Sequence, residues 1–435
     1  MTWSARLRSA MGGGPLADGN FRLLTGGQVT STVGDYCYAV ALPWLVLSGH
    51  GGPTLLGTVL ACYGVPRVVA LPAGGVLADK VGPRRVMLMS DIARAILAGL
   101  LMLVAARHVT AIAVLGPIAV GLGAGEGLFL PAANSIMPSL LAPDRLAAGN
   151  AINMAALQIG SVLGPVLGGA MVAAGGSVPA FAVDAASFAV SAVTLALIRL
   201  SRAAAAQQAP VETAEPDIAS PAVSSAEASP GFWQFVRRER LLKLLMLVTL
   251  VANFGMAGTF EVAMPALAHQ RWGPGGYGAL LACIGVGTVG GTLASARATR
   301  LRKPAVAACL AFLGCAAGIA AIPFLGGLPG AAAAALVLGV GVGFGNTVMI
   351  TLAQRWAPPE LLGRVMSLIM MASFGSYPIS TALTGVLVHV LGPPPFFVIA
   401  GVGLAAAVLG ALSQPVFRGF GAAGAARAAD LAPSL

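Results

Sequence analysis

Hydrophobic residues form long, nearly uninterrupted runs along the chain, and short polar segments separate them. Most runs reach about 20 residues, the length that a helix needs to cross the apolar core of a bilayer. The pattern predicts an all-α membrane protein with twelve transmembrane helices in two pseudo-symmetric halves of six. The expected helices lie near residues 22–48, 54–78, 86–106, 110–134, 147–174, 178–200, 241–268, 275–296, 304–325, 330–355, 363–391 and 394–413.

Positive charge alternates between the connecting segments, and this alternation predicts the orientation. Leaving histidine neutral, the odd-to-even connections carry only Arg107 and Arg271, whereas nearly all other loop Lys and Arg residues lie in even-to-odd connections. Short connections rich in Lys and Arg remain in the cytoplasm. We therefore expect a multi-pass protein of the plasma (inner) membrane with both termini cytoplasmic.

The composition excludes several functional classes. The chain is 57% hydrophobic and only 9% charged, far from the quarter that is typical of soluble domains. The net charge of +10 comes mainly from Lys and Arg residues that gather in alternate loops, as membrane orientation requires, so we expect no nucleic-acid partner. The five cysteines lie in apolar runs without metal spacing, and no nucleotide-binding loop or Ser-His-Asp arrangement is present. We expect neither an enzyme nor a bound cofactor or metal.

One segment departs from the hydrophobic pattern and divides the chain. Residues 201–231 are rich in Ala, Pro, Ser and acidic residues, a composition typical of a flexible linker. Aromatic residues and a basic cluster follow, which favours a short segment at the membrane interface. The expected organisation is a six-helix half at 1–200, a cytoplasmic linker with an interfacial basic segment at 201–240, a second six-helix half at 241–413 and a cytoplasmic tail at 414–435.

The two halves carry traces of a duplication. The sequence GGVLA at 74–78 recurs as GGTLA at 290–294, an offset of 290 − 74 = 216. APDRL at 142–146 recurs loosely as APPEL at 357–361, an offset of 357 − 142 = 215. Parallel duplication of a six-helix unit is an arrangement found among secondary transporters.

A charged turn connects the second and third expected helices. A Gly-Pro pair reverses the chain there, between two apolar segments. A generic cytoplasmic hairpin would carry similar charges, but the pattern also resembles the signature loop of the major facilitator superfamily, with one basic position replaced by Pro83. The resemblance implies a latch that holds the cytoplasmic ends of the two halves together. The latch-loop residues are Gly75, Asp79, Lys80, Gly82, Arg84 and Arg85.

A glycine-rich motif lies in the fifth expected helix. Glycine at every fourth position gives a smooth face for close helix packing, which is the plain structural interpretation. The pattern G-x-x-x-G-P-x-x-G-G also resembles the motif of drug/proton antiporters in the same superfamily. Gly34-Asp35 in the first helix resembles the macrolide and siderophore exporter branch, whereas Pro117 replaces an arginine of many drug antiporters. The motif residues are Gly160, Gly164, Pro165, Gly168 and Gly169.

A few charged residues fall inside the expected helices, where an unpaired charge costs about 2.5 kcal/mol or more. Asp35 and Arg67 lie at matching depths in their helices, and so do Arg94 and Glu126, so depth predicts these two pairs. Arg94 has Asp91 and Asp79 as alternative partners. Asp184 lies near a helix end, so we expect it at the interface. The intramembrane charges are Asp35, Arg67, Arg94, Glu126, Asp184 and Glu261.

These observations predict a secondary transporter that exports a small amphipathic compound by proton antiport, without partners other than its substrate and the bilayer, as a monomer. Glu126 and Glu261 have no partner as obvious as the Arg67 of Asp35, because Arg94 lies nearer the cytoplasm, so they are the expected proton carriers. Asp35 either binds a cationic group or holds the first two helices together. Two alternatives stay open: uptake of a nutrient by proton symport, and a non-transporting receptor or scaffold.

The orientation can be tested with reporter fusions. Fusions after residues 108, 176 and 272 should report an external location, and fusions at 82, 145 and 220 a cytoplasmic one, because basic loops stay inside. A cytoplasmic signal at residue 176 would overturn the twelve-helix count, since every later helix would then change direction.

Overall fold

The structure is a computed structural model, and it describes residues 14–49, 51–199, 236–298, 301, 303–358 and 361–420. The expected linker at 201–240 lies almost wholly outside these residues, and so does most of the expected tail at 414–435.

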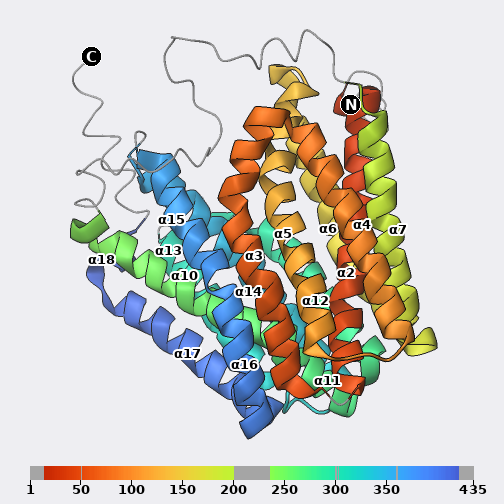
Figure 1. The fold of residues 1–435 in the computed structure, drawn as a ribbon. Helices are drawn as coiled ribbons and strands as arrows, with labels where there is room; N and C mark the ends of the chain where they lie inside the picture. Colours follow the sequence, from red (N-terminus) through yellow and green to blue (C-terminus); the bar gives the residue numbers. More distant parts are fainter. Residues whose placement is uncertain are drawn as a thin grey trace, which may run out of the picture. The chain divides into compact units, whose positions relative to one another are not determined.

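Regular structure in the described residues consists of helices, with no strand among them. Short 3-10 turns precede α2 and follow α5, and a π-helical turn η3 (Thr259–Ala263) joins α10 to α11. Figure 1 shows the long helices. They are α2 (Gly19–Ser48), α3 (Gly52–Val81), α4 (Pro83–Ala106), α5 (Ile112–Ile136), α6 (Pro143–Gly175), α7 (Ser177–Leu197), α10 (Arg240–Gly258), α11 (Met264–Arg271), α12 (Gly273–Ser295), α13 (Pro304–Ala321), α14 (Gly327–Trp356), α15 (Leu362–Gly375), α16 (Tyr377–Leu391) and α17 (Pro393–Ser413), with a final turn α18 (Pro415–Arg418).

Eleven helices of the described chain are long and apolar enough to cross a membrane. The predicted all-α membrane class is therefore confirmed. The remaining expected span corresponds to α2, which has 30 residues but is not among the eleven. Polar residues such as Thr25, Gln28 and Asp35 interrupt its apolar surface, so the count of twelve is not fully confirmed.

Two of the expected spans are interrupted helices. The span near 241–268 contains the π-helical turn η3, with Glu261 inside it. The span near 363–391 divides into α15 and α16 at Ser376, just before Pro378. Proline has no backbone N–H to donate, which explains the second break. Single π turns inside α-helices are frequent at functional sites.

The chain forms two compact units. The first comprises Met1–Leu45 and Cys62–Ser220, and the second comprises Val46–Ala61 and Pro221–Leu435. In the first unit α4 packs against both α5 and α7, as Figure 1 shows. In the second unit α14 packs against α12 and α13, and α17 packs against α10 and α13.

The glycine motif of α6 forms a close seam with α2. A Cβ atom built on Gly160 would lie 3.0 Å from Thr32 Cγ2, and one on Gly168 would lie 2.8 Å from Cys37 Cα. Between them, Gly164 O accepts a weak hydrogen bond from Cys37 Sγ at 3.6 Å. The packing interpretation of the motif is thus confirmed, and its partner is the helix that carries Asp35.

A second seam joins α3 to α5. Gly123 and Gly127, one turn apart on α5, lie directly against the backbone carbonyls of Tyr63 and Arg67 on α3. Glycine permits this approach because it has no Cβ. The backbone of the two helices is thereby brought close at the level of Arg67.

The second unit repeats this seam with the offset found in the sequence. Gly339 and Gly343 on α14 lie against the carbonyls of Ile284 and Thr288 on α12. These glycines follow Gly123 and Gly127 by 339 − 123 = 216 and 343 − 127 = 216 residues. The duplication is therefore visible in the helix packing as well as in the loops.

The α6 motif also has a counterpart in α16, although its residues differ. At the offset of 216 its three spaced glycines become Ser376, Ser380 and Thr384, all buried. Ser380 Oγ donates to the carbonyl of Phe254 on α10 at 2.5 Å. This copy is not visible as a glycine motif in the sequence, because hydroxyl-bearing residues replace the glycines.

The charged turn between α3 and α4 has a structural task. Gly82 adopts φ +91°, and Pro83 begins α4. Arg84 donates from Nε to the carbonyl of Leu195 and from Nη2 to that of Ala196, both at 2.7 Å. Arg84 thus caps the C-terminal end of α7, where carbonyl groups lack partners and positive charge is favourable.

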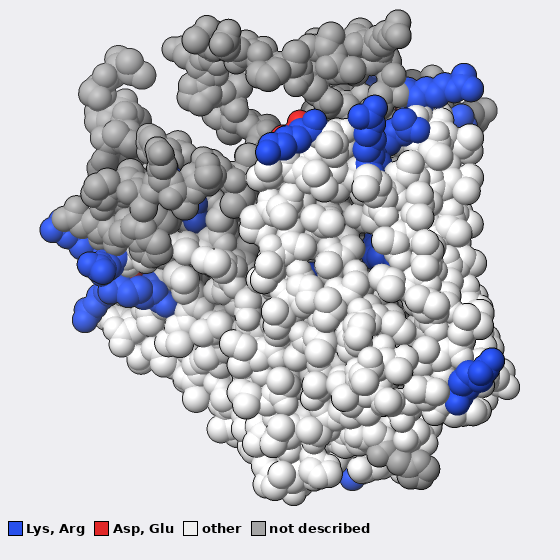
Figure 2. Space-filling model, viewed as in Figure 1, with Lys and Arg blue, Asp and Glu red and all other residues white. Residues whose placement is uncertain are grey.

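Charged side chains avoid the flanks of the helices. Figure 2 shows Lys and Arg mainly at helix ends, whereas the flanks visible in this view are formed almost wholly by uncharged residues. Large apolar side chains such as Val69, Ile96 and Leu293 are more than half exposed on the described helices. Such a surface matches a hydrocarbon environment, where apolar residues face lipid.

The α2–α6 seam predicts a sharp size limit at Gly168. We expect Gly168→Leu to lower the free energy of unfolding by about 1–3 kcal/mol, because the added side chain must push α2 away. Thermal unfolding of the detergent-purified protein measures the change. Gly99→Ala is the control, since a Cβ there meets nothing within 4 Å. Equal melting temperatures of the two variants would contradict the seam.

Candidate functional site

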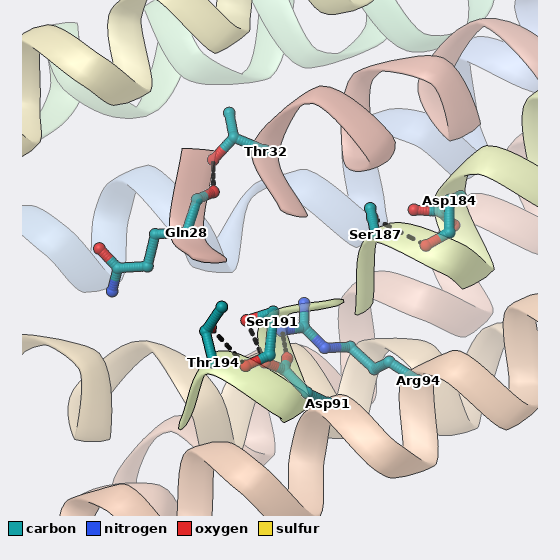
Figure 3. A network of polar contacts seen from close by, with 8 residues as sticks. All are labelled: Gln28, Thr32, Asp91, Arg94, Asp184, Ser187, Ser191 and Thr194. Atoms are coloured by element: carbon teal, nitrogen blue, oxygen red, sulfur yellow. Dashed lines mark hydrogen bonds and ion pairs between the residues drawn. The ribbon is translucent and has the colours of Figure 1, made fainter. Parts of the chain in front are cut away.

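A buried polar network occupies the interior of the first unit, and Asp91 joins Arg94 and Ser191 within it (Figure 3). Arg94 Nη2 lies 2.6 Å from Asp91 Oδ1, one turn earlier on α4. Ser191 on α7 donates its hydroxyl to Asp91 Oδ2 at 2.6 Å. Asp91 is fully buried and Arg94 is only 4% exposed. The network therefore holds a desolvated ion pair whose carboxylate accepts bonds from both helices.

Aromatic rings complete the surroundings of the guanidinium. Arg94 Cζ lies 4.6 Å from the ring centroid of Phe129 on α5 and 4.3 Å from that of Phe188 on α7. Cations are attracted to aromatic faces at such distances. Gly125 on α5 provides the space, since a Cβ there would lie 2.9 Å from Arg94 Cγ. Arg94 is thus fixed by α4, α5 and α7 together.

A second ion pair lies across the α3–α5 seam. Arg67 Nη2 is 3.1 Å from Glu126 Oε1, and both side chains are about one-fifth exposed. The depth argument that paired Arg67 with Asp35, and Glu126 with Arg94, is wrong. Depth along a helix does not fix the direction of a side chain, whereas the glycine seam places α3 directly beside α5. The alternative of Asp91 for Arg94 is confirmed.

Asp184 is a buried residue of α7, only 1% exposed, and not the interfacial group that its sequence position predicted. Its Oδ1 atom has no hydrogen-bond donor among the described residues. Gly34 on α2 lies against it, and a Cβ at Gly34 would be 3.0 Å from Oδ1. The neighbouring Ser187 hydroxyl donates to the backbone carbonyl of Asp184 instead, at 2.8 Å.

Asp35 follows Gly34 on α2 and is exposed, in contrast to Asp91 and Asp184. It lies within electrostatic range of Arg94, Asp91 and Arg67, and Asp184 experiences its negative charge. The first unit therefore gathers four carboxylates around two arginines, and Asp35 is the most accessible of the four.

Glu261, the remaining charge predicted inside a span, belongs to the second unit. It lies in η3 and is partly exposed. Tyr277 on α12 donates its hydroxyl to the carbonyl of Phe260 at 3.0 Å, and its phenol lies within electrostatic range of Glu261. Within the second unit, Glu261 thus has Tyr277 as a buried polar neighbour.

The latch-loop residues lie apart from this cluster. Asp79, Lys80 and Arg85 are exposed at the end of α3 and the start of α4, and Arg84 caps α7. The glycines of the α6 motif lie closer to the cluster, because they pack against α2, the helix that carries Asp35.

Repeat-related positions of the second unit are apolar. The first residues of α4 and α13, Pro83 and Pro304, differ by 304 − 83 = 221, which places Cys315 at the position of Arg94. The contacts agree, because Cys315 lies against Gly341 as Arg94 lies against Gly125. The ion pair is consequently a property of the first unit alone.

Sequence reasoning underestimated Asp91 and Asp184. Asp91 and Arg94 lie one helical turn apart, a spacing at which side chains meet, and this signal was available. For Asp184 the available signal was the apolar sequence on both sides of it. The unpaired oxygen of Asp184 could not have been found from sequence, because it depends on which helices surround α7.

Comparison with known proteins places this chain in a family. The profile described as Major Facilitator Superfamily matches residues 24–379, which is most of the chain. The chain belongs to the major facilitator superfamily. The prediction of a transporter, and not an enzyme, is confirmed by this membership. Members of the superfamily generally need no cofactor.

The chain resembles the multidrug efflux pump Tap of Mycolicibacterium fortuitum, with 27% identity over 86% of this chain and 90% of the relative. The multidrug efflux pump Tap of Mycobacterium tuberculosis is 26% identical over 89% of this chain and 91% of the relative. Both alignments span nearly the full length of each protein.

Solved structures support the same fold. A POT family transporter in complex with 5-aminolevulinic acid has a TM-score of 0.69 at 14% identity and covers 92% of this chain and 97% of its own. A bacterial homologue of the iron transporter ferroportin in the inward-facing state has a TM-score of 0.63 at 17% identity, with the same coverage. At these identities the likeness concerns the fold alone.

The ion pair of α4 predicts strong coupling between its members. Asp91→Asn alone should destabilise the protein by about 3–5 kcal/mol, because it leaves the guanidinium of Arg94 buried without a counter-charge. The double variant with Arg94→Met should lose less than the sum of the single losses. Unfolding of the purified protein in detergent measures both.

The control for this cycle is Asp144→Asn. Asp144 pairs with Arg145 at 4.0 Å and is largely exposed, so its loss should cost less than about 1 kcal/mol. Additive losses in the cycle at Asp91 and Arg94 would contradict the coupled pair.

Proposed function

We propose that this transporter exports a small amphipathic or drug-like compound by proton antiport, with alternating access. Membership in the superfamily provides the general mechanism. Two relatives are named multidrug efflux pumps, and the α6 glycines resemble the motif of drug/proton antiporters. The observation that carries the proposal is the cluster of four carboxylates and two arginines inside the first unit.

The charge of this cluster is suited to exchange. If all its groups were ionised, four carboxylates and two arginines would leave an excess of two negative charges. Such an excess between membrane helices is costly, so a proton or a cationic cargo is needed to neutralise it. A proton and a cation that compete for the same carboxylates bind in turn, and this competition couples export to the proton gradient.

We assign separate tasks to the residues of the cluster. Asp35 is accessible and binds the cationic group of the cargo. Glu126 is held by Arg67, and Asp91 by Arg94, so these carboxylates position the helices. Glu126 therefore no longer fits the reasoning that made it a proton carrier, which required that it had no partner as obvious as that of Asp35. Glu261 remains a candidate for the second unit.

Orientation and assembly complete the proposal. The protein lies in the plasma membrane with both termini in the cytoplasm, because Lys and Arg gather in the even-to-odd connections of the sequence. It works as a monomer. Asp79 and its basic neighbours latch the cytoplasmic ends of the halves, since a carboxylate at a helix end can exchange partners during rocking.

The test is transport by the purified protein in liposomes, with ethidium as a cationic probe. A proton gradient should drive ethidium movement in the wild type, and Asp35→Asn should weaken apparent ethidium binding by about tenfold, the effect of losing one charge-assisted contact. Asp144→Asn, at an exposed pair outside the cluster, serves as the control. Ethidium movement that ignores the gradient would refute proton antiport for this protein.

A further inference from the structure

Asp184 combines two features that seldom occur together in a membrane helix. Its side chain is almost fully buried, and its Oδ1 atom has no donor among the described residues. An ionised carboxylate oxygen without a donor is costly in a low-dielectric interior, and a bound proton removes most of that cost. The site is therefore suited to a group that gains and loses a proton.

The second unit shows that packing does not require this carboxylate. Gly176 and Gly392, which precede α7 and α17, differ by 392 − 176 = 216, so Ala400 occupies the position of Asp184. Ala400 lies beside Gly255 on α10, with its Cβ 3.9 Å from a Cβ built there. Asp184 lies beside Gly34 in the same way. A methyl group fills the repeated seam, so the carboxyl at Asp184 serves another purpose.

The charged groups around Asp184 come from two helices. Asp35 and Cys37 on α2 and Arg94 on α4 lie within electrostatic range of it, and Asp91 holds the guanidinium of Arg94. Asp35 and Asp184 lie close enough to repel each other when both are ionised. A proton shared by two neighbouring carboxylates relieves such repulsion.

Exposure separates the two carboxylates. Asp35 is exposed, whereas Asp184 lies behind it against Gly34. A proton from water can reach Asp35 first and then Asp184. The arrival of a cation at Asp35 would also relieve the repulsion, and would allow Asp184 to release its proton.

We propose that Asp184 is the residue that binds the transported proton, with Asp35 as its exchange partner at the exposed side. The carboxylate of Asp184 takes up one proton to become a carboxylic acid, and releases that proton through Asp35 to water. No bond to the cargo forms. This inference rests on the proposed proton antiport and names its proton site.

The first test is spectroscopic and needs no substrate. Infrared difference spectra of the full-length protein, recorded as the pH is stepped from roughly 5 to 9, report carboxylic acids that lose their proton. We expect a carboxylic acid signal that disappears in Asp184→Asn and shifts in Asp184→Glu. Glu126→Gln is the control, because Glu126 is held by Arg67 and should leave the signal in place.

Asp184→Ala secures the test against misfolding, because it reproduces the residue found at position 400 of the repeat. It should insert and melt like the wild type and also lack the signal. An identical signal in the wild type, Asp184→Asn and Asp184→Ala would overturn the proposal.

A transport experiment distinguishes a failure of this proposal from a failure of the proposed function. In liposomes, Asp184→Asn should reduce gradient-driven ethidium movement by about tenfold or more, the scale of losing a positioned proton-transfer group. Downhill ethidium exchange should stay within about twofold, because the exchange needs no proton. Wild-type coupling that persists in Asp184→Asn would refute the proton site and leave antiport intact. Absence of coupling in the wild type would refute antiport itself.

Discussion

The guanidinium of Arg94 is the group around which the interior of the first unit is arranged. A buried cation is tolerated only if a counter-charge and hydrogen-bond partners surround it. Asp91 supplies the charge, Phe129 and Phe188 supply their ring faces, and Gly125 supplies the space. These residues lie on α4, α5 and α7, so meeting the needs of one side chain fixes the packing of three helices. The other charges of the cluster, Asp35 and Asp184, then lie within its field.

The two units use one packing scheme for different chemistry. Paired glycines bring α3 to α5 and α12 to α14, so backbone contact is shared by both copies. Arg94 is replaced by Cys315, and Asp184 by Ala400. A duplicated scaffold needs its seams in both halves, because close helix approach holds each unit together. Charges are costly inside a membrane, and the packing of the second unit does without a charge at these two positions.

Under the proposed antiport, the same cluster of carboxylates binds both the proton and the cargo. The cluster has fewer arginines than carboxylates, and the accessible carboxylate of Asp35 lies beside the enclosed one of Asp184. A cation at the first changes the cost of a proton at the second through electrostatic repulsion alone. As proposed, such coupling requires no large movement within the unit, and alternating access would decide only which side of the membrane the site faces.

The sequence by itself determined the helices, because the length of an apolar run and its polar borders reflect the thickness of the bilayer core. It also determined the duplication and the glycine face of α6, since these are regularities along one chain. The tertiary structure decided the partners. Matching depths predicted that Arg67 pairs with Asp35. The direction of a side chain around its helix and the neighbour that it meets depend on packing between helices, however. The glycine seam brings α3 to α5, and Arg67 pairs with Glu126. Asp184 likewise became a buried carboxylate, with an Oδ1 atom that lacks a donor among the described residues, only through the helices that surround α7.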